Sequence, residues 1–475
     1  MFDFHQEIKH SKEALMGTIN STNLNLNHPK SILSSLQSSK GLPFSEILSK
    51  QVINEVIVVL EYRVRTYAPD ITLWALLSQT IDADQSLQAA VDRVIAFNTS
   101  KNLPVPSSNT SAYSQARTRL PEDILSNLTR TSAEQLEQAA PSEWKWRNRT
   151  VQLVDGSSVS MEDTPENQNI YPQIRGQKPG LGFPIANIVA IISLATGMIK
   201  NVSIGPYSGK ETGEHALLRQ IFQTLKAGDI VVADRYYCSF FLVVTLIQMG
   251  IDVVFPQHGT RRTDFRKGKS LGKRDHIVQW KKSKKPEWMD QETYDGFPEE
   301  IEMREVLIEN SQKGFRTTKR IMVTTFLNSR SVTKEDLSEL YGYRWLVELD
   351  LRTIKDTMNM GVLRGKTPEM VRKEIWARLL AYNLIRKIMA QAAVVYEKKP
   401  RELSFKNALQ SVRSFRDKGL LNEKNKEHYF QLLKAVASKR IGNRPGRQEP
   451  RRVKRRPKPT PLLTKPRHFY HKKAA

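Results

Sequence analysis

The chain has 475 residues, of which 39% are hydrophobic, so most of it should fold around a real core. Its formal net charge is +25 and its pI is about 9.9, which favours a polyanionic partner: nucleic acid first, an anionic membrane surface second. The positive charge is spread over several segments rather than one amphipathic helix, which weakens the membrane interpretation.

Cysteine content and apolar runs bear on the compartment. The single cysteine, Cys238, cannot form an internal disulfide, and no cysteine–histidine spacing indicates a zinc site. The longest apolar run, residues 183–199, is slightly short for a membrane span and contains Asn187, which favours two strands joined by a turn. The first residues lack the basic-then-apolar pattern of a secretory signal. We therefore expect a cytoplasmic protein with no membrane partner.

Residues 1–140 have the pattern of a helical domain with polar connectors. Helices are predicted over residues 46–65 and 71–98, the second broken near residues 82–84, and a polar loop over 99–121 leads into a short basic helix. Pro141 marks a plausible boundary.

The pattern then changes to α/β alternation around a mixed sheet, which we expect to form the first part of a core over residues 145–256. Strands are predicted over residues 150–159, 184–194, 197–205, 229–237 and 251–256. A helix is predicted over residues 213–225, and residues 239–250 fit a helix or a buried apolar segment.

A basic, strand-rich insertion is predicted over residues 257–319, with residues 300–309 alternating like a strand pair. The second part of the core, residues 320–397, begins with a strand over 320–327 and continues with two helices, 333–358 and 367–397.

A C-terminal helical region, residues 398–438, precedes a basic tail over residues 439–475. The tail holds 14 Lys and Arg against one acid, Glu449, so it carries +13 of the +25 net charge. Such a segment should be disordered when free and should add salt-dependent affinity for any nucleic acid.

Three acids stand where chemistry is possible: Asp155 follows the predicted strand VQLV, Asp234 follows IVVA, and Glu348 lies in the helix after the insertion. Neighbouring parallel strands would bring the two aspartates together, and a crossing helix could add Glu348. Such a cluster needs cations, and two Mg²⁺ ions about 3.5–4 Å apart support in-line phosphoryl chemistry.

Each acid also has a simpler interpretation. Asp155-Gly156 is a common hairpin dipeptide. Asp234-Arg235 could be an ion pair at a strand end, and Glu348 could be an ordinary surface acid.

Helix geometry favours a functional interpretation of Glu348. At 100° per residue, one face within about 60° carries Tyr341, Arg344, Glu348 and Lys355. Arg352 could join this face, whereas Asp350 falls on the opposite side and is interpreted as solvated. The face therefore combines one candidate metal ligand with groups suited to phosphates.

These four residues match the Y-(2)-R-(3)-E-(6)-K signature of a large group of bacterial insertion-sequence transposases of the DDE type. Asp155 in VDGS and Asp234 in ADRYY resemble the group's two aspartate motifs, and ARLLAYNLIR at residues 377–386 resembles its C-terminal catalytic-domain helix. The resemblance covers about residues 110 to 390, is weak before 110 and is absent from the basic tail.

This resemblance implies a ribonuclease H-like catalytic core in which Asp155, Asp234 and Glu348 bind two Mg²⁺ ions, with Mn²⁺ as a substitute. Water would free a 3′-OH at each transposon end, a hairpin intermediate would follow in many members, and the 3′-OH would finally attack target DNA. Neither a covalent enzyme intermediate nor ATP is implied, and the sequence has no Walker-type glycine motif.

Further DNA contacts are expected from several basic and aromatic residues. Tyr341, Arg344 and Lys355, with Arg352 beside them, would hold phosphates and the terminal nucleotide. Residues 261–286 carry eleven Lys and Arg against two Asp. Trp280 or Trp288 could stack on a flipped base, or each could simply pack in the core. Arg117 and Arg119 lie in a segment that resembles the group's DNA-end-binding region.

The sequence therefore predicts a cut-and-paste DNA transposase of the bacterial cytoplasm, nucleoid-associated when bound. It would act as a homodimer on double-stranded DNA, at inverted-repeat ends and at the target. Three alternatives remain: a metal-dependent nuclease without joining activity, a catalytically inactive DNA-binding derivative, and an RNA-binding protein that uses the tail.

Overall fold

The computed structural model describes residues 66–100, 102–310, 318–418, 426–442, 463–466 and 469. The predicted helix over residues 46–65 and most of the predicted basic tail lie outside these ranges. The chain divides into two compact units, a helical unit (Met1–Trp144 and Trp376–Arg440) and a sheet unit (Lys145–Ile375 and Ile441–Ala475).

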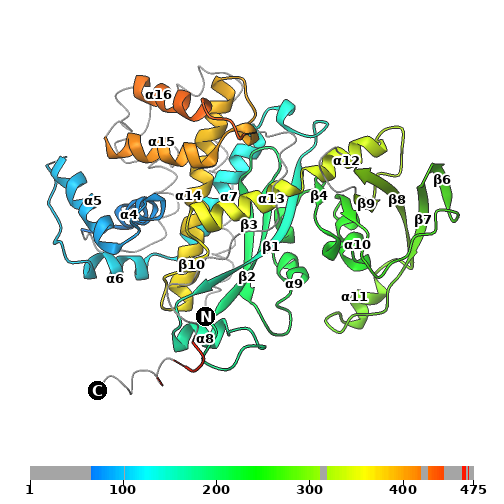
Figure 1. The fold of residues 1–475 in the computed structure, drawn as a ribbon, viewed down its shortest axis with the longest axis horizontal. Helices are drawn as coiled ribbons and strands as arrows, with labels where there is room; N and C mark the ends of the chain where they lie inside the picture. The colour runs from blue at the N-terminus through cyan, green and yellow to red at the C-terminus, as the bar shows by residue number, and fades with distance from the viewer. Residues whose placement is uncertain are drawn as a thin grey trace, which may run out of the picture. The chain divides into compact units, whose positions relative to one another are not determined.

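The sheet unit is built on a mixed ten-stranded sheet, in which nine strands follow the order β3-β2-β1-β4-β5-β9-β8-β7-β6 and β10 pairs with β1 (Figure 1). The strands in chain order are β1 Val151–Met161, β2 Ile185–Ser193, β3 Ile199–Pro206, β4 Ile230–Val232, β5 Asp252–Pro256, β6 Lys269–Gly272, β7 Asp275–Lys281, β8 Glu300–Asn310, β9 Thr318–Thr324 and β10 Val362–Leu363. β1, β2 and β3 form an antiparallel meander, and β4 and β5 run parallel to β1. The insertion strands β6 to β8 extend this sheet through β9 rather than forming one of their own.

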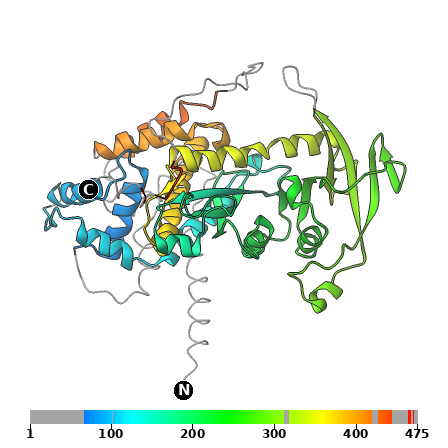
Figure 2. The same cartoon turned by 60° about the horizontal axis from the view of Figure 1, so that its bottom comes forward.

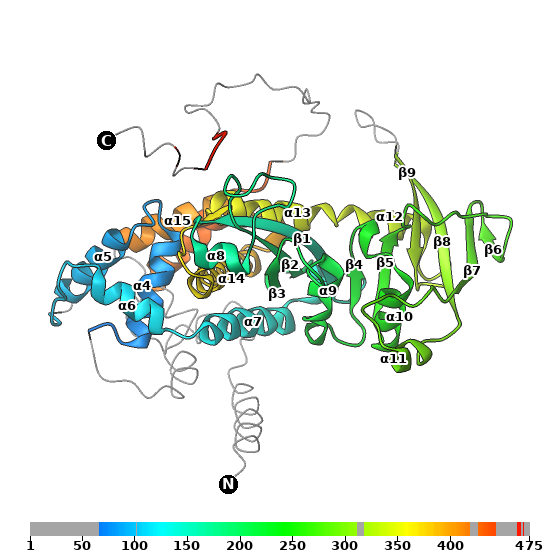
Figure 3. The same cartoon turned by 90° about the horizontal axis from the view of Figure 1, so that it is seen from below.

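Helices cover both faces of the central strands, as the views in Figures 2 and 3 agree. α12 and α13 cross one face, and α9 and α10 lie on the other. Helices of this unit are α8 Pro165–Ile170, α9 Glu214–Arg219, α10 Phe240–Gln248, α11 Gln291–Asp295, α12 Lys334–Gly342, α13 Trp345–Arg352 and the start of α14 Pro368–Val395. Two short 3₁₀ helices are η3 Phe222–Thr224 and η4 Arg235–Tyr237, and η5 Thr353–Thr357 is a short π-helix.

The structure differs from the sequence prediction at three elements. β1 continues through Asp155 and Gly156 and pairs with β2 along nine register positions, so the hairpin interpretation is wrong. Residues 300–309 belong to one strand, β8, because cross-strand partners on both sides extend it. The helix predicted over 333–358 divides into α12, α13 and the π-helix η5.

The helical unit contains α4 Pro69–Ile81, α5 Leu87–Ser100, α6 Ser111–Arg119, α7 Glu122–Ala139, the later part of α14, α15 Phe405–Asp417 and α16 Lys426–Ala437, with 3₁₀ turns η2 Ser142–Trp144 and η6 Pro400–Glu402. The predicted break between α4 and α5 is confirmed. α7 packs on α14, where Trp376 Nε1 donates to Glu122 at 3.0 Å and Asn383 Nδ2 donates to the Thr129 carbonyl at 3.1 Å.

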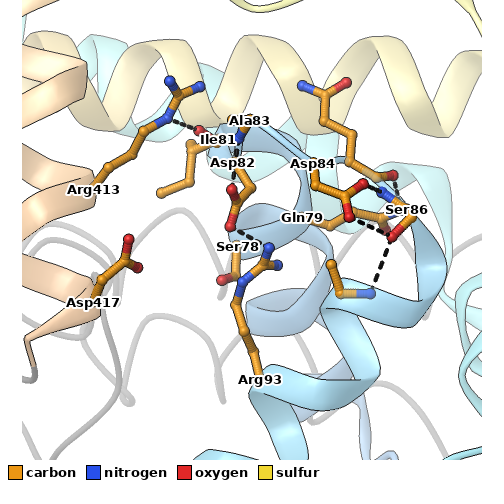
Figure 4. A network of polar contacts seen from close by, with 12 residues as sticks. Ser78, Gln79, Ile81, Asp82, Ala83, Asp84, Ser86, Arg93, Arg413 and Asp417 are labelled. Carbon is orange, nitrogen blue, oxygen red and sulfur yellow. Dashed lines mark hydrogen bonds and ion pairs between the residues drawn. The ribbon is translucent and has the colours of Figure 1, made fainter.

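A polar network fixes the α4–α5 turn (Figure 4). Asp82 pairs with Arg93 of α5, and Arg413 of α15 donates to the Ile81 carbonyl. Asp84 accepts from the backbone amide of Ser86 at 2.9 Å, which orders the entry to α5. In the described ranges, no helix has the length and hydropathy needed to cross a bilayer.

Candidate active site

The register of two parallel strands brings Asp155 and Asp234 to one place in the sheet. Leu153 of β1 lies opposite Val232 of β4, and each aspartate follows its strand partner by two residues. Because both strands run in the same direction, the two aspartates extend side by side. β4 ends at Val232 while β1 continues, so the site lies where β1 loses one neighbour.

Asp234 is oriented by the turn that it begins. It is the N-cap of η4, and its Oδ1 accepts from the backbone amide of Tyr236 at 2.8 Å. No ion pair joins it to Arg235, which is exposed. The simpler interpretation of Asp234 as half of a strand-end ion pair is therefore wrong.

Glu348, on α13, is linked to Asp155 by Arg344, which interacts with both carboxylates. The Arg344 guanidinium donates to Glu348 Oε1 and lies 3.7 Å from Asp155 Oδ2. All three side chains are largely buried, with 17% of Arg344, 19% of Asp155 and 30% of Glu348 exposed. The arginine therefore balances two carboxylates that come from different elements.

The other two residues of the signature face the same region. Lys355 Nζ donates to Ser157 Oγ of β1 at 3.4 Å, so its charge lies two residues along the strand from Asp155. The Tyr341 ring lies 5.9 Å from the Arg344 guanidinium carbon, with Arg320 at a similar distance of 5.7 Å. The four residues of the signature, which are separated in sequence, therefore form one cluster beside β1.

Asp350 is buried, contrary to the prediction from helix geometry that it is exposed to solvent. Its exposed fraction is 2%, so the interpretation of Asp350 as a solvated acid is wrong. The side of α13 opposite Glu348 is covered by protein, which the periodicity of an isolated helix cannot reveal.

Sequence reasoning missed two side chains that adjoin the aspartates, Glu214 and Tyr237. The Tyr237 hydroxyl donates to Glu214 Oε2 at 2.8 Å, and Tyr237 is completely buried. Glu214 is the first residue of α9, far from both aspartates in sequence, and no local pattern marks it.

The electrostatics of these acids suit a cation. Burial raises the pKa of Asp155 to about 6 against the opposing effects of the Gly156 amide and Arg344, and the charges of Glu214 and Asp234 raise it further. Burial also raises the pKa of Glu214, to which the charge of Asp234 adds. These carboxylates are partly buried and repel one another. A hard divalent cation bound between them would relieve this repulsion.

In the part of the chain that the structure describes, no three His, Cys, Asp or Glu side chains are arranged as a complete metal-binding group. Arg344 supplies the positive charge between Asp155 and Glu348 instead. The fit to a divalent cation rests on the chemistry of the carboxylates, which repel one another, and Arg344 is the competing counter-charge.

The remaining predicted DNA-binding residues fall into different environments. Arg352 and Arg119 are exposed, and Arg117 is half-buried against Tyr113. Trp280 is 1% exposed, its Nε1 donates to Glu305 at 2.9 Å and Arg261 covers its ring, so its ring is packed in the core. Trp288 is 44% exposed, with Arg219 over its ring at 3.9 Å.

Comparison with known proteins identifies the chain. The family described as "Transposase DDE domain" matches residues 146–384, just over half of the chain. "Transposase InsG for insertion sequence element IS4" from Escherichia coli K12 is 26% identical over 435 residues, covering 88% of this chain and 92% of that protein. "Putative transposase InsZ" from the same organism is 26% identical over 146 residues, covering 27% of this chain and 48% of that protein.

Among solved structures, the cryo-EM structure of the piggyBac transposase synaptic complex with hairpin DNA has a TM-score of 0.42 and 10% identity, covering 88% of this chain and 87% of that one. That score is too low to support an argument about fold or function. The family match carries the assignment: the chain belongs to the Transposase DDE domain family and is an insertion-sequence transposase that acts on DNA.

Proposed function

We propose that this transposase cuts DNA at the ends of its element in a Mg²⁺-dependent reaction and joins the freed 3′-OH to target DNA, by a cut-and-paste route with a hairpin intermediate. Asp155, Asp234 and Glu348 would hold two Mg²⁺ ions, with Mn²⁺ as an alternative, in a ribonuclease H-like core. The observation that carries the proposal is the common register of Asp155 and Asp234, together with the link from Asp155 to Glu348 through Arg344.

Bound divalent ions would supply an activated water or 3′-OH and stabilise charge on the reacting phosphate. The chain's own residues bind and orient the DNA. Arg344 offers two parallel donors to a phosphate, whereas Lys355 offers a point charge, and both lie beside the acids. Tyr341, next to Arg344, is suited to packing against the terminal nucleotide.

Outside this cluster, we assign DNA contacts to Arg352, Arg117 and Arg119 and base stacking to Trp288. An exposed flat ring beside a guanidinium is suited to stacking on a flipped base. The exposed cations of the β6–β7 hairpin and its flanks would follow the phosphate backbone: Arg262, Arg266, Lys267, Lys269, Lys273, Arg274, Lys281, Lys284 and Lys285. Residues 1–140 would bind the transposon ends, and two copies of the chain would pair them.

The test uses duplexes that contain the inverted repeats flanking the gene. The wild-type chain should cut them with Mg²⁺, form a hairpin and join ends to target DNA. Asp155→Asn, Asp234→Asn and Glu348→Gln should each lower cutting at least 1,000-fold, roughly 4 kcal/mol of transition-state stabilisation. They should leave DNA binding largely in place. Glu335→Gln, which removes an exposed acid from α12, is the matched control.

Other outcomes separate the alternatives. Cutting without joining would make the protein a nuclease. Binding of end DNA without cutting would make it an inactive derivative. Cutting at wild-type rate by Glu348→Gln would contradict the assignment of the site.

A further inference from the structure

Glu214 lies beside the two aspartates, although it belongs to neither of their strands. It begins α9, and its Oε2 accepts a hydrogen bond of 2.8 Å from the Tyr237 hydroxyl. Tyr237 ends the η4 turn that Asp234 caps, and its burial is complete. One oxygen of Glu214 is therefore tied to the segment that carries Asp234.

The other oxygen of Glu214 lies against Gly156. A β-carbon built on Gly156 would stand 2.3 Å from Glu214 Oε1 and 2.4 Å from its Cδ. Successive strand residues face opposite sides of the sheet, so Asp155 faces α13 while Gly156 faces α9. The Glu214 carboxylate therefore fills the volume that a side chain at residue 156 would need.

Glu214 thus links the segments that carry the two aspartates. It contacts the residue after Asp155 and, through Tyr237, the turn after Asp234. Its electrostatic interaction with each aspartate is repulsive. This side chain therefore contacts both segments and adds to the negative potential around the pair.

We propose that Glu214 is a positioning residue that holds Asp155 and Asp234 at a fixed spacing and increases their affinity for a divalent cation. The inference rests on the proposed function, since it requires these aspartates to be the cation's ligands. Binding of a cation relieves the repulsion among three carboxylates, so removing one of the charges weakens binding. Supporting groups around metal sites typically change metal affinity or activity by 10–100-fold.

Two substitutions separate the charge of Glu214 from its position. Glu214→Gln keeps the shape and an oxygen that can accept from Tyr237, but it removes the charge. Gly156→Ala keeps the charge but displaces the carboxylate, at little cost to folding, because the obstructing atoms end a flexible side chain. Glu162→Gln is the control, an exposed acid that directly follows β1.

The experiment measures two quantities for the full chain. One is the Mg²⁺ concentration that half-saturates cleavage of the end duplex, and the other is the rise in melting temperature with Mg²⁺ in the absence of DNA. Glu214→Gln and Gly156→Ala should raise the half-saturating concentration about tenfold and shift the Mg²⁺ dependence of the melting temperature equally. Cleavage at saturating Mg²⁺ should stay near wild type, and the control should not change.

A double substitution tests whether Gly156 acts through Glu214. Glu214→Ala removes the atoms that a new β-carbon would meet, so adding Gly156→Ala to it should cause no further change. If Glu214→Gln fails to fold, this comparison still tests whether Gly156 acts through Glu214.

Unchanged Mg²⁺ dependence in both Glu214→Gln and Gly156→Ala overturns the inference. A fall in cleavage at every Mg²⁺ concentration, together with a lower melting temperature, assigns Glu214 a purely structural role and also overturns it. A wild-type chain that does not cut with Mg²⁺, or an Asp155→Asn variant that cuts normally, instead overturns the proposed function.

Discussion

At the scale of single residues, Arg344 connects the acids of the candidate site. Arg344→Lys keeps the charge but loses the planar pair of donors that can reach two oxygens at once. We expect end cleavage to fall about tenfold or more with little change in DNA binding. A gel shift and a Mg²⁺ cleavage assay on the same end duplex measure both. Arg330→Lys, at an exposed position to which no DNA contact is assigned, is the control, and full activity of Arg344→Lys would contradict the bidentate role.

Asp155 should destabilise the metal-free protein at neutral pH. Its folded-state pKa of about 6 exceeds the unfolded value, so the cost of the charged form is absent below about pH 4 and complete above about pH 7. Asp155→Asn should therefore stabilise the protein by about 1–2 kcal/mol at pH 7.5, after allowing for solvent screening, and by almost nothing at pH 4. Melting temperatures in EDTA across this range test the sign. A variant that is less stable than wild type at pH 7.5 would refute the prediction.

At the level of elements, a buried ion pair joins two insertion strands, β7 and β8, to each other. Arg304 of β8 is fully buried and donates to both carboxylate oxygens of Asp275 on β7, at 2.8 and 2.6 Å. Asp275→Asn leaves a buried guanidinium uncompensated and should cost about 3–5 kcal/mol. Glu309→Gln breaks an exposed β8–β9 pair with Lys319 and should cost about 0–1 kcal/mol. Equal melting temperatures for the two variants would be incompatible with this account.

At the scale of the whole molecule, charge should set the general affinity for DNA. Deleting residues 439–475 removes 14 cations and one acid, which is +13 of the net +25. Affinity should fall similarly for all DNA sequences, and the salt dependence should flatten by about 0.9 per lost phosphate contact. Titrations of end and random duplexes at several salt concentrations measure this. Loss of the preference for end duplexes, with unchanged non-specific binding, would mean that the tail recognises a specific DNA sequence.

The family and the α/β alternation could be predicted from the sequence, which also supplied the candidate acids and their signature. The expected DDE transposase is confirmed by the family match. The strands at residues 184–194 and 197–205 and the break near Asp82 are also confirmed. These features are local: they depend on side-chain periodicity, on turn residues and on spacing within one segment.

The way in which segments distant in sequence meet could not be predicted, because it depends on how the chain packs in three dimensions. The pairing of β1 with β2 makes Asp155 part of a continuous strand, and packing buries Asp350. Trp280 is buried and Trp288 is exposed, a difference that the composition of this segment does not reveal. Glu214 reaches Gly156 only because α9, which packs on β2 and β3, brings its first residue to β1, a contact that spans 58 positions from 156 to 214. Register, burial and such contacts are set by chain segments packing against one another, and no local pattern contains that information.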